Sequence, residues 1–330
     1  SWRDRFGESD GGADGRGAQR MNDALMSHAT ETITVGSKSF ATASKLFDPA
    51  TRRSALMLYA WCRYCDDVID EQELGFRTEV PQQESALARL EMLRVETQRA
   101  FDGEAMGEPA FAAFQEVVTR HEMPAHLAFA HLEGFAMDVR ETHYQTFDDT
   151  LRYCYHVAGV VGLMMAWIMG VRDEAVLDRA RDLGLAFQLT NIARDIVEDA
   201  ENGRCYLPAQ WLAEEGMTAR EIADPAKRQH IARLARRLVM AAEPYYASAK
   251  AGLRGLPLRS AWAIAAAHGV YRQIGIKVMA AGAAAWEQRQ GTSKAEKLGL
   301  LAKGAGMALT SRLSRPAPRP AHLWQRPRAR

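Results

Sequence analysis

Hydrophobic positions along this chain recur at the three- and four-residue spacings of amphipathic helices, and the alternation typical of strands is almost absent. Within residues 84–101, for example, Leu87, Leu90 and Leu93 are expected to face a core. The predicted helices cover about residues 28–44, 48–71, 84–101, 110–122, 124–141, a segment from 148 or 150 through the apolar run 157–171, and then 174–199, 225–253, 257–288 and 293–313.

Residues typical of helix starts support several of these boundaries. Asp48 and Asp224 each precede a proline, which combines a side-chain cap with a residue suited to the first helical turn. Ser293 and Glu296 have the spacing of a capping box. The pattern therefore predicts an all-α protein.

Neither an internal repeat nor a change of composition marks a boundary between residues 21 and 314. We therefore expect one all-α domain over residues 21–314, with roughly 10 to 12 helices in a bundle around a central cavity. Residues 1–20 are polar and glycine-rich and are expected to form a disordered leader, with Met21 as a candidate start. Residues 315–330 form a basic, proline-rich tail that we expect to be poorly ordered.

The longest apolar run, residues 157–171, has 15 residues, which is short of the roughly 20 needed to span a bilayer. We expect it to be a buried helix. Its small residues Gly159 and Gly162 would leave room for a long hydrocarbon, and Met164 and Met165 would adapt to one. Ordinary core packing is the alternative for each of them.

Composition narrows the function classes. Lys and Arg number 42 against 41 Asp and Glu, so there is no global field to attract nucleic acid or an anionic membrane, although basic residues concentrate near the C-terminus. The pair Cys62 and Cys65 has the spacing of half a zinc site but lacks a second pair, so helix packing is the better interpretation. Few cysteines and the lack of a signal-peptide pattern favour a cytoplasmic protein.

A polar stripe runs along the predicted helix 174–199. Gln188, Asn191, Asp195 and Asp199 are spaced by 3, 4 and 4 residues and fall within about 80° around a helix. Apolar residues such as Ile192 occupy the opposite side. A solvated helix face would explain this stripe if it stood alone.

A second helix carries a matching stripe of Tyr59, Arg63, Asp66 and Asp70, spaced by 4, 3 and 4 residues and lying within about 60°. Four carboxylates that converge in a helical bundle repel one another unless cations lie between them. Mg2+ binds one or two carboxylates, keeps several waters and bridges to phosphates. Two helices with the spacing DxxxD therefore predict a site that holds a diphosphate through Mg2+.

Other residues suit the same chemistry. Arg63, Arg194 and Arg204 flank the acids and can bind phosphate oxygens, with a surface ion pair as the alternative for Arg194. Ser37 and Lys38 offer further donors, or a helix cap. Tyr59, Tyr206 and Tyr271 can stabilise a carbocation through their ring faces.

Three long segments of the chain resemble the squalene and phytoene synthase family of isoprenyl diphosphate enzymes. They are SKSF followed by YAWCRYCDDVID, then YCYHVAGVVGLMM, and finally LGLAFQLTNIARDIVEDAENGRCYLP. The nearest likeness within the family is to bacterial phytoene synthases, whose tails also look like RPAHLWQRP. This resemblance implies the squalene-synthase-type α fold and a head-to-head condensation of two geranylgeranyl diphosphates, through prephytoene diphosphate, to phytoene.

The resemblance also implies roles for individual residues. Those that match metal-binding positions are Asp66, Asp70, Asp195 and Asp199, with Gln188 and Asn191 beside them. Those that match the flap or substrate-binding positions are Ser37, Phe40, Tyr59, Arg63, Arg204, Tyr206 and, less securely, Tyr271, while a position near Gln288 or Arg289 supplies a further phosphate contact. Mg2+ is the expected cofactor, with Mn2+ as a substitute, and activation by a nucleotide stays open.

Alternatives within and outside the family also stay open. A relative that uses farnesyl diphosphate would make dehydrosqualene or squalene with the same acids. A terpene cyclase is less favoured, because its second metal motif usually mixes Asn or Asp with Ser or Thr and Glu, and a non-catalytic interaction protein would not need paired acids. No dinucleotide motif is visible, so NADPH is not expected. Peripheral membrane contact and contact with other carotenoid-pathway enzymes are further expectations.

Overall fold

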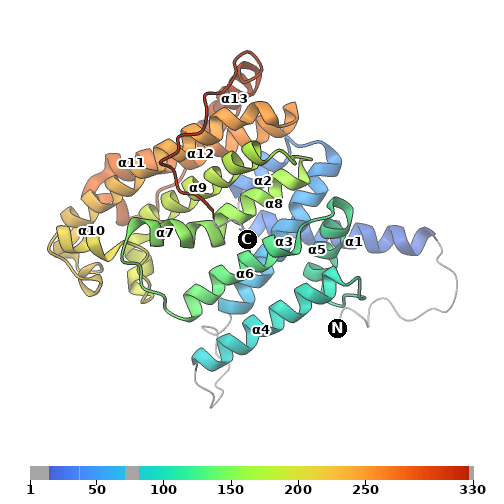
Figure 1. The fold of residues 1–330 in the computed structure, drawn as a ribbon, viewed down its shortest axis with the longest axis horizontal. Helices are drawn as coiled ribbons and strands as arrows, with labels where there is room; N and C mark the ends of the chain where they lie inside the picture. Colours follow the sequence, from blue (N-terminus) through green and yellow to red (C-terminus); the bar gives the residue numbers. More distant parts are fainter. Residues whose placement is uncertain (1–14, 37, 71–81, 327–330) are drawn as a thin grey trace. The chain divides into compact units, whose positions relative to one another are not determined.

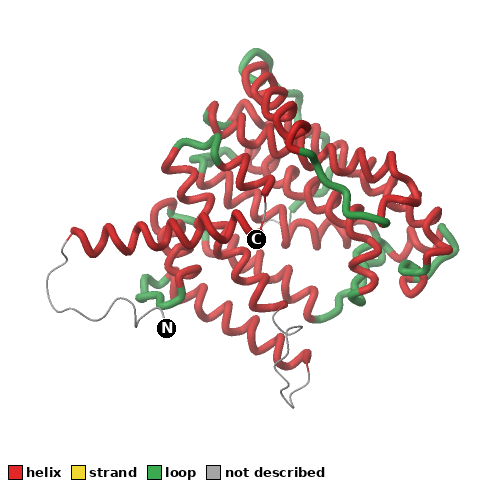
Figure 2. The backbone as a smooth tube through the Cα atoms, turned by 180° about the vertical axis from the view of Figure 1, so that it is seen from behind, coloured by secondary structure: helices red, strands yellow, loops and turns green. Residues whose placement is uncertain are grey.

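A computed structural model describes residues 15–36, 38–70 and 82–326, and all regular structure in them is helical. Figure 2 shows helices joined by loops, without a strand in these described ranges. The all-α fold class is therefore confirmed. The chain divides into two compact units, Ser1–Val139 and Arg140–Arg330. The sequence predicted one domain, because no change of composition marks position 139.

The first unit consists of six helices in its described part, which are coloured blue to green in Figure 1. They are α1 (Gly15–Gly36), α2 (Lys38–Ser44), α3 (Pro49–Asp70), α4 (Gln82–Phe101), α5 (Pro109–His121) and α6 (Ala125–Val139). Helix α1 begins within the leader that was expected to be disordered, so that expectation is wrong for residues 15–20. Residues 1–14 lie outside the described ranges.

Helix α3 packs against α1, α4 and α5 and supplies much of the buried surface of this unit. Trp61 is fully buried and stacks on Phe114 of α5, with 4.1 Å between ring centroids. The Arg53 guanidinium donates to both carboxylate oxygens of Glu116, which fixes α3 against α5 near its start. These contacts set which side of α3 faces away from the core.

The second unit carries longer helices. Its elements are α7 (Phe147–Cys154), the π-helix η3 (Tyr155–Gly159), α8 (Val160–Ile168), α9 (Glu174–Glu201), α10 (Ala209–Glu214), the short 3-10 helices η4 (Ala219–Glu221) and η5 (Pro225–Lys227), α11 (Arg228–Gly252), η6 (Leu253–Gly255), α12 (Leu258–Ala281), η7 (Gly282–Trp286) and α13 (Lys294–Thr310). The predicted capping box at Ser293 and Glu296 is present. The cap of α7, however, is Thr146 and not residue 148 or 150.

Helix α9 is the centre of this unit and contacts α7, η3, α8, α11 and α12 (Figure 1). Its contact with α8 and η3 is unusually close. A methyl group placed on Gly184 would lie 2.3 Å from the carbonyl oxygen of Ala158, and one on Gly162 would lie 2.5 Å from that of Ala180. Gly162 therefore allows two helices to approach, which agrees with core packing and not with room for a hydrocarbon at this residue.

The continuous helical segment Phe147–Ile168 is long and apolar enough to cross a membrane by length and composition alone, the only such segment within the described ranges. Of its most apolar window, 61% is buried inside the structure. Val160, Leu163 and Met164 are almost inaccessible to solvent, since this segment packs on α9. The prediction of a buried helix is confirmed.

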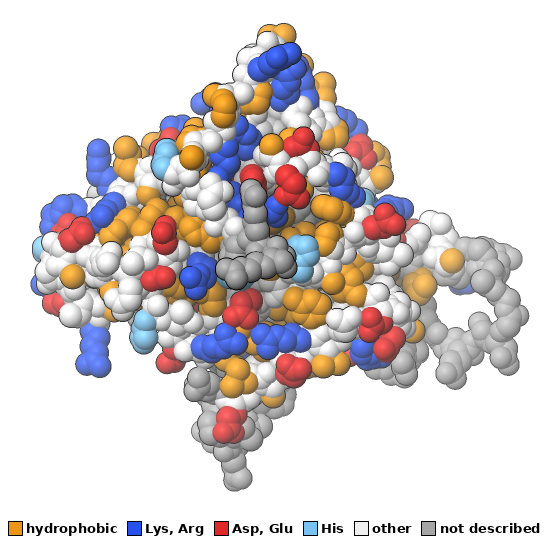
Figure 3. Space-filling view, viewed as in Figure 1, with side chains coloured by type: hydrophobic (Ala, Val, Ile, Leu, Met, Phe, Trp, Pro, Cys, Tyr) orange, Lys and Arg blue, Asp and Glu red, His pale blue; other side chains and the backbone are white. Residues whose placement is uncertain are grey.

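Figure 3 shows acidic and basic side chains interspersed over most of the face it presents. This distribution is consistent with the near-balance of charges in the sequence.

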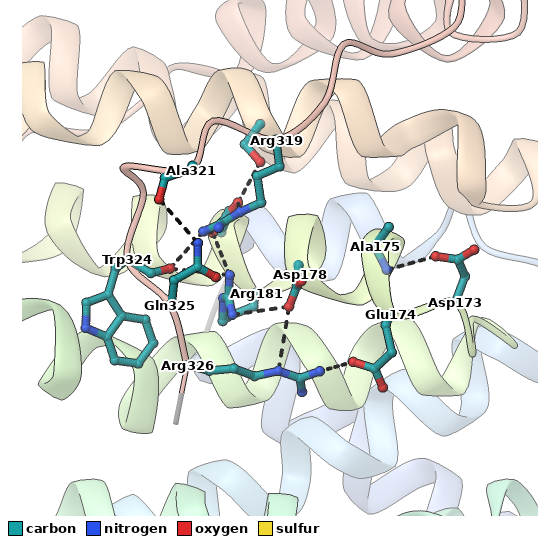
Figure 4. Close-up of polar contacts among 12 residues, drawn as sticks. Asp173, Glu174, Ala175, Asp178, Arg181, Arg319, Ala321, Trp324, Gln325 and Arg326 are labelled. Carbon is teal, nitrogen blue, oxygen red and sulfur yellow. Dashed lines mark hydrogen bonds and ion pairs between the residues drawn. The ribbon is translucent and has the colours of Figure 1, made fainter. Parts of the chain in front are cut away.

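The C-terminal tail is held to the second unit through residue 326, so the expectation that it is poorly ordered is wrong for residues 315–326 (Figure 4). Arg319 donates from Nε and Nη2 to the two carboxylate oxygens of Asp182, at 2.7 and 2.8 Å. Asp182 lies on α9 and is fully buried, and Ser248 of α11 also donates to it. A buried carboxylate needs such partners, and the tail supplies the strongest one.

The end of the tail makes further contacts with the same unit (Figure 4). Leu323 is buried, and the backbone N–H of Trp324 donates to the hydroxyl of Tyr245 at 3.0 Å. Arg326 forms an ion pair with Glu174 at the first turn of α9. Composition alone suggested that the tail is disordered, because composition does not reveal partners that lie more than 70 residues away in sequence.

The buried ion pair generates a stability prediction. Arg319→Ala should lower the free energy of unfolding by about 3 kcal/mol, because it leaves Asp182 buried with weaker partners. Arg315→Ala, four residues earlier at an exposed position, should change it by no more than about 0.5 kcal/mol. Urea denaturation of both variants measures the difference, and equal effects would contradict a structural role for the tail.

Candidate functional site

The first acidic pair lies on α3. Asp48 caps this helix by accepting from the backbone N–H of Thr51 at 3.1 Å, and Pro49 is its first residue. Tyr59, Arg63, Asp66 and Asp70 follow one side, where they are exposed or partly exposed, while Trp61, Cys65 and Val68 on the other side are buried. The predicted stripe therefore faces away from the core of its unit.

Arg63 is an ion-pair partner within this stripe. Its guanidinium lies 3.7 Å from Asp66 and 3.1 Å from Asp67. All three side chains are roughly half exposed, so the pairs are screened by solvent and contribute little to stability. These ion pairs keep the Arg63 guanidinium next to the carboxylates of Asp66 and Asp67.

Phe40 and Tyr59, two residues predicted for the same site, lie together. Phe40 belongs to α2, and its ring stacks on that of Tyr59 with 5.6 Å between centroids. The structure thus joins Phe40, the last residue of the SKSF segment, to the α3 stripe. Ser37, also predicted for this flap, lies outside the described residues, and the side chain of Lys38 is likewise not described.

The second acidic pair lies on α9, which Asp173 caps through the backbone N–H groups of Ala175 and Val176. Gln188 accepts a long hydrogen bond of 3.4 Å from the Asn191 side-chain amide. The Oδ1 atom of Asn191 is buried and has no hydrogen-bond partner. A buried amide oxygen without a partner is costly, and it is also a ligand that suits Mg2+.

Asp195, one turn further along α9, is engaged by two arginines. Arg194 donates to both of its carboxylate oxygens at 2.7 Å, and Arg289 lies 3.9 Å away. Burial lowers the pKa of Arg194, but the hydrogen bond and the charge of Asp195 outweigh it and raise the pKa above its usual value. Arg194 therefore reaches Asp195 directly and is not a surface ion pair, since both side chains are mostly buried.

Tyr271 of α12 is near the same arginines. Burial raises the pKa of its phenol, while the charges of Arg194 and Arg289 act in the opposite direction. Its ring stacks on Phe187 of α9 at 4.1 Å. The phenol accordingly stays protonated at neutral pH and presents an aromatic wall beside the guanidinium groups.

Asp199, Arg204 and Tyr206 come together at the end of α9. They line a small pocket of about 10 Å³, enough for one water molecule, together with the apolar residues Ile192 and Ile196. The chain turns back here because the backbone N–H of Arg204 donates to the carbonyl of Asp199 at 2.8 Å. The motif DAENGRCYLP thus places Arg204 beside the last acid of the stripe.

Tyr206 itself is buried and held in a cluster of tyrosines. Its ring stacks on Tyr153 at 4.4 Å and lies 5.9 Å from Tyr144, and its carbonyl accepts from the Thr150 hydroxyl. The structure therefore brings the second and third sequence segments side by side. Because the side chain of Tyr206 is mostly buried, it suits a positioning role better than direct contact with a substrate.

The residues present fit a magnesium site built from pairs. Within the described ranges, no three His, Cys, Asp or Glu side chains form a cluster that could hold a metal by themselves. Each helix instead offers two carboxylates, and α9 adds the unpartnered Asn191 oxygen. Mg2+ commonly takes one or two carboxylates and completes its shell with water and phosphate oxygens, so pairs are sufficient. Convergence of the two pairs stays a prediction.

Some neighbours of the site were not singled out from the sequence. Phe187 and Tyr153 were not predicted as neighbours of the site, because an aromatic residue on a helix is interpreted as a core residue unless its partner is known. Arg289 was placed only approximately, and its distance to Asp195 now connects it to the α9 acids. The thiols of Cys62 and Cys65 are unpaired, and burial raises the pKa of Cys62 to about 12, which agrees with a packing role.

Known structures define the class of the protein. A crystal structure of a dehydrosqualene synthase in complex with ligand matches with a TM-score of 0.79 and 25% identity over 88% of this chain and 99% of the other. The complex structure of TcSQS with the ligand BPH1237 matches with a TM-score of 0.70 over 92% and 94%, at 18% identity. An all-helical chain with these neighbours and two acidic helices has the isoprenoid synthase fold.

Sequence comparison then gives the family. A family model described as Squalene/phytoene synthase matches residues 33–296. A 15-cis-phytoene synthase of Enterobacter agglomerans is 69% identical over 89% of this chain and 100% of its own length. A 15-cis-phytoene synthase of Pantoea ananas is 66% identical over 93% and 99%. The chain belongs to the squalene/phytoene synthase family.

The unpartnered oxygen of Asn191 leads to a binding prediction. Mg2+ with inorganic diphosphate should raise the melting temperature of the wild-type protein, because a ligand that binds only the folded state stabilises it. Asn191→Ala and Asp195→Asn should reduce this increase, whereas Glu201→Gln at the exposed end of the same helix should keep it. Differential scanning fluorimetry measures the shifts, and an unchanged increase in Asn191→Ala would exclude this residue as a ligand.

Proposed function

We propose that this chain is a prenyltransferase that joins two geranylgeranyl diphosphates head to head and releases phytoene and two diphosphates. The observation that carries the proposal is the 69% identity to a relative named 15-cis-phytoene synthase, over that relative's full length. The acidic helices support it, since the substrate of such a reaction binds through diphosphate groups. A place in carotenoid biosynthesis follows from the product.

Asp66, Asp70, Asn191, Asp195 and Asp199 are the proposed metal ligands, and Gln188 positions Asn191 through their hydrogen bond. When bound, Mg2+ would neutralise the diphosphate and assist its departure as a leaving group. Mn2+ is a candidate substitute, because carboxylate and carbonyl oxygens also suit it.

The arginines near the acids bind and orient the diphosphates. Arg194 and Arg289 lie beside Asp195, Arg204 lies beside Asp199, and Arg63 lies beside Asp66. A guanidinium presents paired N–H donors that match phosphate oxygens, so each can hold one diphosphate oxygen while its neighbouring carboxylate holds the metal. These arginines also stabilise the charge that accumulates on the departing diphosphate.

The aromatic residues protect the cationic intermediates. Departure of a diphosphate from an allylic carbon leaves a carbocation that water would trap. The stacked pair Phe40 and Tyr59 and the stacked pair Phe187 and Tyr271 provide apolar ring faces next to the acidic stripes. Such faces attract a cation and exclude water.

The proposed reaction needs no reductant. The first step forms the cyclopropane of prephytoene diphosphate with loss of one diphosphate and one proton. The second step loses the other diphosphate, rearranges the carbon skeleton and ends with loss of a proton to give the new double bond. Electrons balance without a hydride donor, so NADPH is not part of the proposal; activation by a nucleotide stays open.

Location and partners complete the proposal. We place the enzyme in the cytoplasm, in peripheral contact with a membrane, because the product is a hydrocarbon that does not dissolve in water. Other enzymes of carotenoid synthesis are candidate partners, since one of them must accept phytoene.

Product analysis tests the proposal. Purified protein with Mg2+ is given geranylgeranyl diphosphate or farnesyl diphosphate, each with and without NADPH. Phytoene from the C20 substrate without NADPH is the expected result. A C30 product would support the alternative activity of the dehydrosqualene synthase that shares its fold, and absence of both products would refute the proposed function.

Two neighbouring aspartates allow a matched test of the stripe. Asp66→Asn should lower turnover by roughly 100-fold or more, because it removes a charged metal ligand. Asp67→Asn should have a much smaller effect, since Asp67 lies about 100° further around the helix and pairs with Arg63. Steady-state kinetics with geranylgeranyl diphosphate measure both, and equal losses would contradict the assignment of Asp66.

A further inference from the structure

Helix α13 presents a hydrophobic face to solvent. Leu298, Leu309 and Leu313 are 67%, 58% and 85% exposed. Leu298 and Leu309 lie about 20° apart around the axis of α13, and Leu313 follows in the turn just after the helix ends at Thr310. Exposed leucines are common singly, but these three mark an apolar strip along the outer side of α13 and the turn after it.

The packing of α13 fixes this face outward. Its opposite side lies on α12, where the small residues Gly304 and Ala308 are buried. The indole N–H of Trp262 donates to the carbonyl of Leu301 at 2.8 Å, and Lys277 forms an ion pair of 2.6 Å with Glu296. The helix therefore cannot turn its leucines inward without losing these contacts.

Basic residues border the apolar strip. Residues 294–315 contain five basic side chains, Lys294, Lys297, Lys303, Arg312 and Arg315, against the single acid Glu296. Around the axis of α13, Lys294 lies about 40° to one side of Leu298, and Lys303 lies on the other side, about 120° from Leu309. Glu296 is already paired with Lys277. Figure 3 shows the same combination at the top of the view, where hydrophobic and basic side chains gather over α13.

The strip continues onto the start of α12. Arg312 donates to the carbonyl groups of Arg254 and Leu256, and Arg254 donates to that of Ser314. These bonds hold the end of α13 close to Leu258, which is 48% exposed. The surface therefore joins an exposed leucine and the basic residues Arg254 and Arg259 to those of α13.

We propose that this surface, formed by the outer face of α13 and the first turn of α12, docks the protein on an anionic lipid bilayer. Leu298, Leu309 and Leu313 would enter the boundary between headgroups and acyl chains, and the neighbouring lysines Lys294 and Lys303 would contact anionic headgroups. An apolar helix face bordered by basic residues is the pattern of helices that lie in a membrane surface.

Charge favours a bilayer over a second copy of the chain. In a twofold dimer the same patch would meet itself, so two strongly basic surfaces would face each other and repel. The biological need for a membrane-binding surface rests on the proposed function, because the C40 hydrocarbon product must pass into a lipid phase. The binding itself is measurable without any substrate.

Sedimentation of the full-length protein with vesicles tests the proposal. The protein should pellet with vesicles of mixed phosphatidylcholine and phosphatidylglycerol, less with phosphatidylcholine alone, and less when salt is raised. The combined variant Leu298→Ser, Leu309→Ser, Leu313→Ser should bind at least ~10-fold more weakly. The pair Lys294→Gln, Lys303→Gln should weaken binding to the anionic vesicles only.

Matched controls lie elsewhere in the chain. Met240→Ser removes an apolar side chain that is 51% exposed on α11, and Lys45→Gln removes an exposed charge; neither should alter binding. Turnover in detergent solution should be unchanged in the leucine variant, which separates the docking surface from the proposed activity.

Two outcomes would overturn the proposal. The first is leucine and lysine variants that bind vesicles as tightly as the wild-type protein. The second is a wild-type protein that ignores anionic vesicles and forms a dimer, detected by sedimentation velocity, that the leucine variant abolishes. That second result would assign the surface to a second copy of the chain.

Discussion

The close contact between α9 and the helical segment before it determines how the second unit is built. Gly184 allows α9 to touch the backbone at Ala158, where any larger residue would collide. Gly184 also lies within about 40° of Gln188 around the helix, on the side that carries Asn191, Asp195 and Asp199. The first half of that side is therefore buried by packing, and the polar stripe begins one turn after the packed region ends.

The π-helix η3 belongs to the same arrangement. Its five residues Tyr155–Gly159 widen the helix just where it approaches α9, and such segments are frequent at functional sites. Before it, α7 carries Tyr153 and Thr150, which hold Tyr206 at the far end of the acidic stripe. The segment from α7 to η3 thus packs on α9 just before the stripe begins, through Ala158, and holds the loop that follows the stripe, through Tyr153 and Thr150.

Two aspartates of α9, Asp182 and Asp195, have arginine partners but differ in burial. Asp182, in the first half of the helix, is buried and forms a structural ion pair with Arg319 of the tail. Asp195, about three and a half turns later, is partly buried and paired with Arg194, in a place where a diphosphate and its metal could exchange with that partner. On α13 the charged residues differ again, because its basic residues lie near exposed leucines and do not form ion pairs with acids of the same helix.

The sequence by itself determined the helical class, most helix starts and the two polar stripes, because these depend on spacing of 3 and 4 residues and on local caps such as Asp48 and Ser293. The long motifs also indicated the family. Tertiary structure alone decided that Gly162 serves packing, that Arg319 fixes the tail, that Arg194 meets Asp195 and that Phe187 meets Tyr271. The helical period says which side of a helix a residue occupies, but the partner on that side comes from a distant segment or from side-chain conformation, and burial depends on the whole fold.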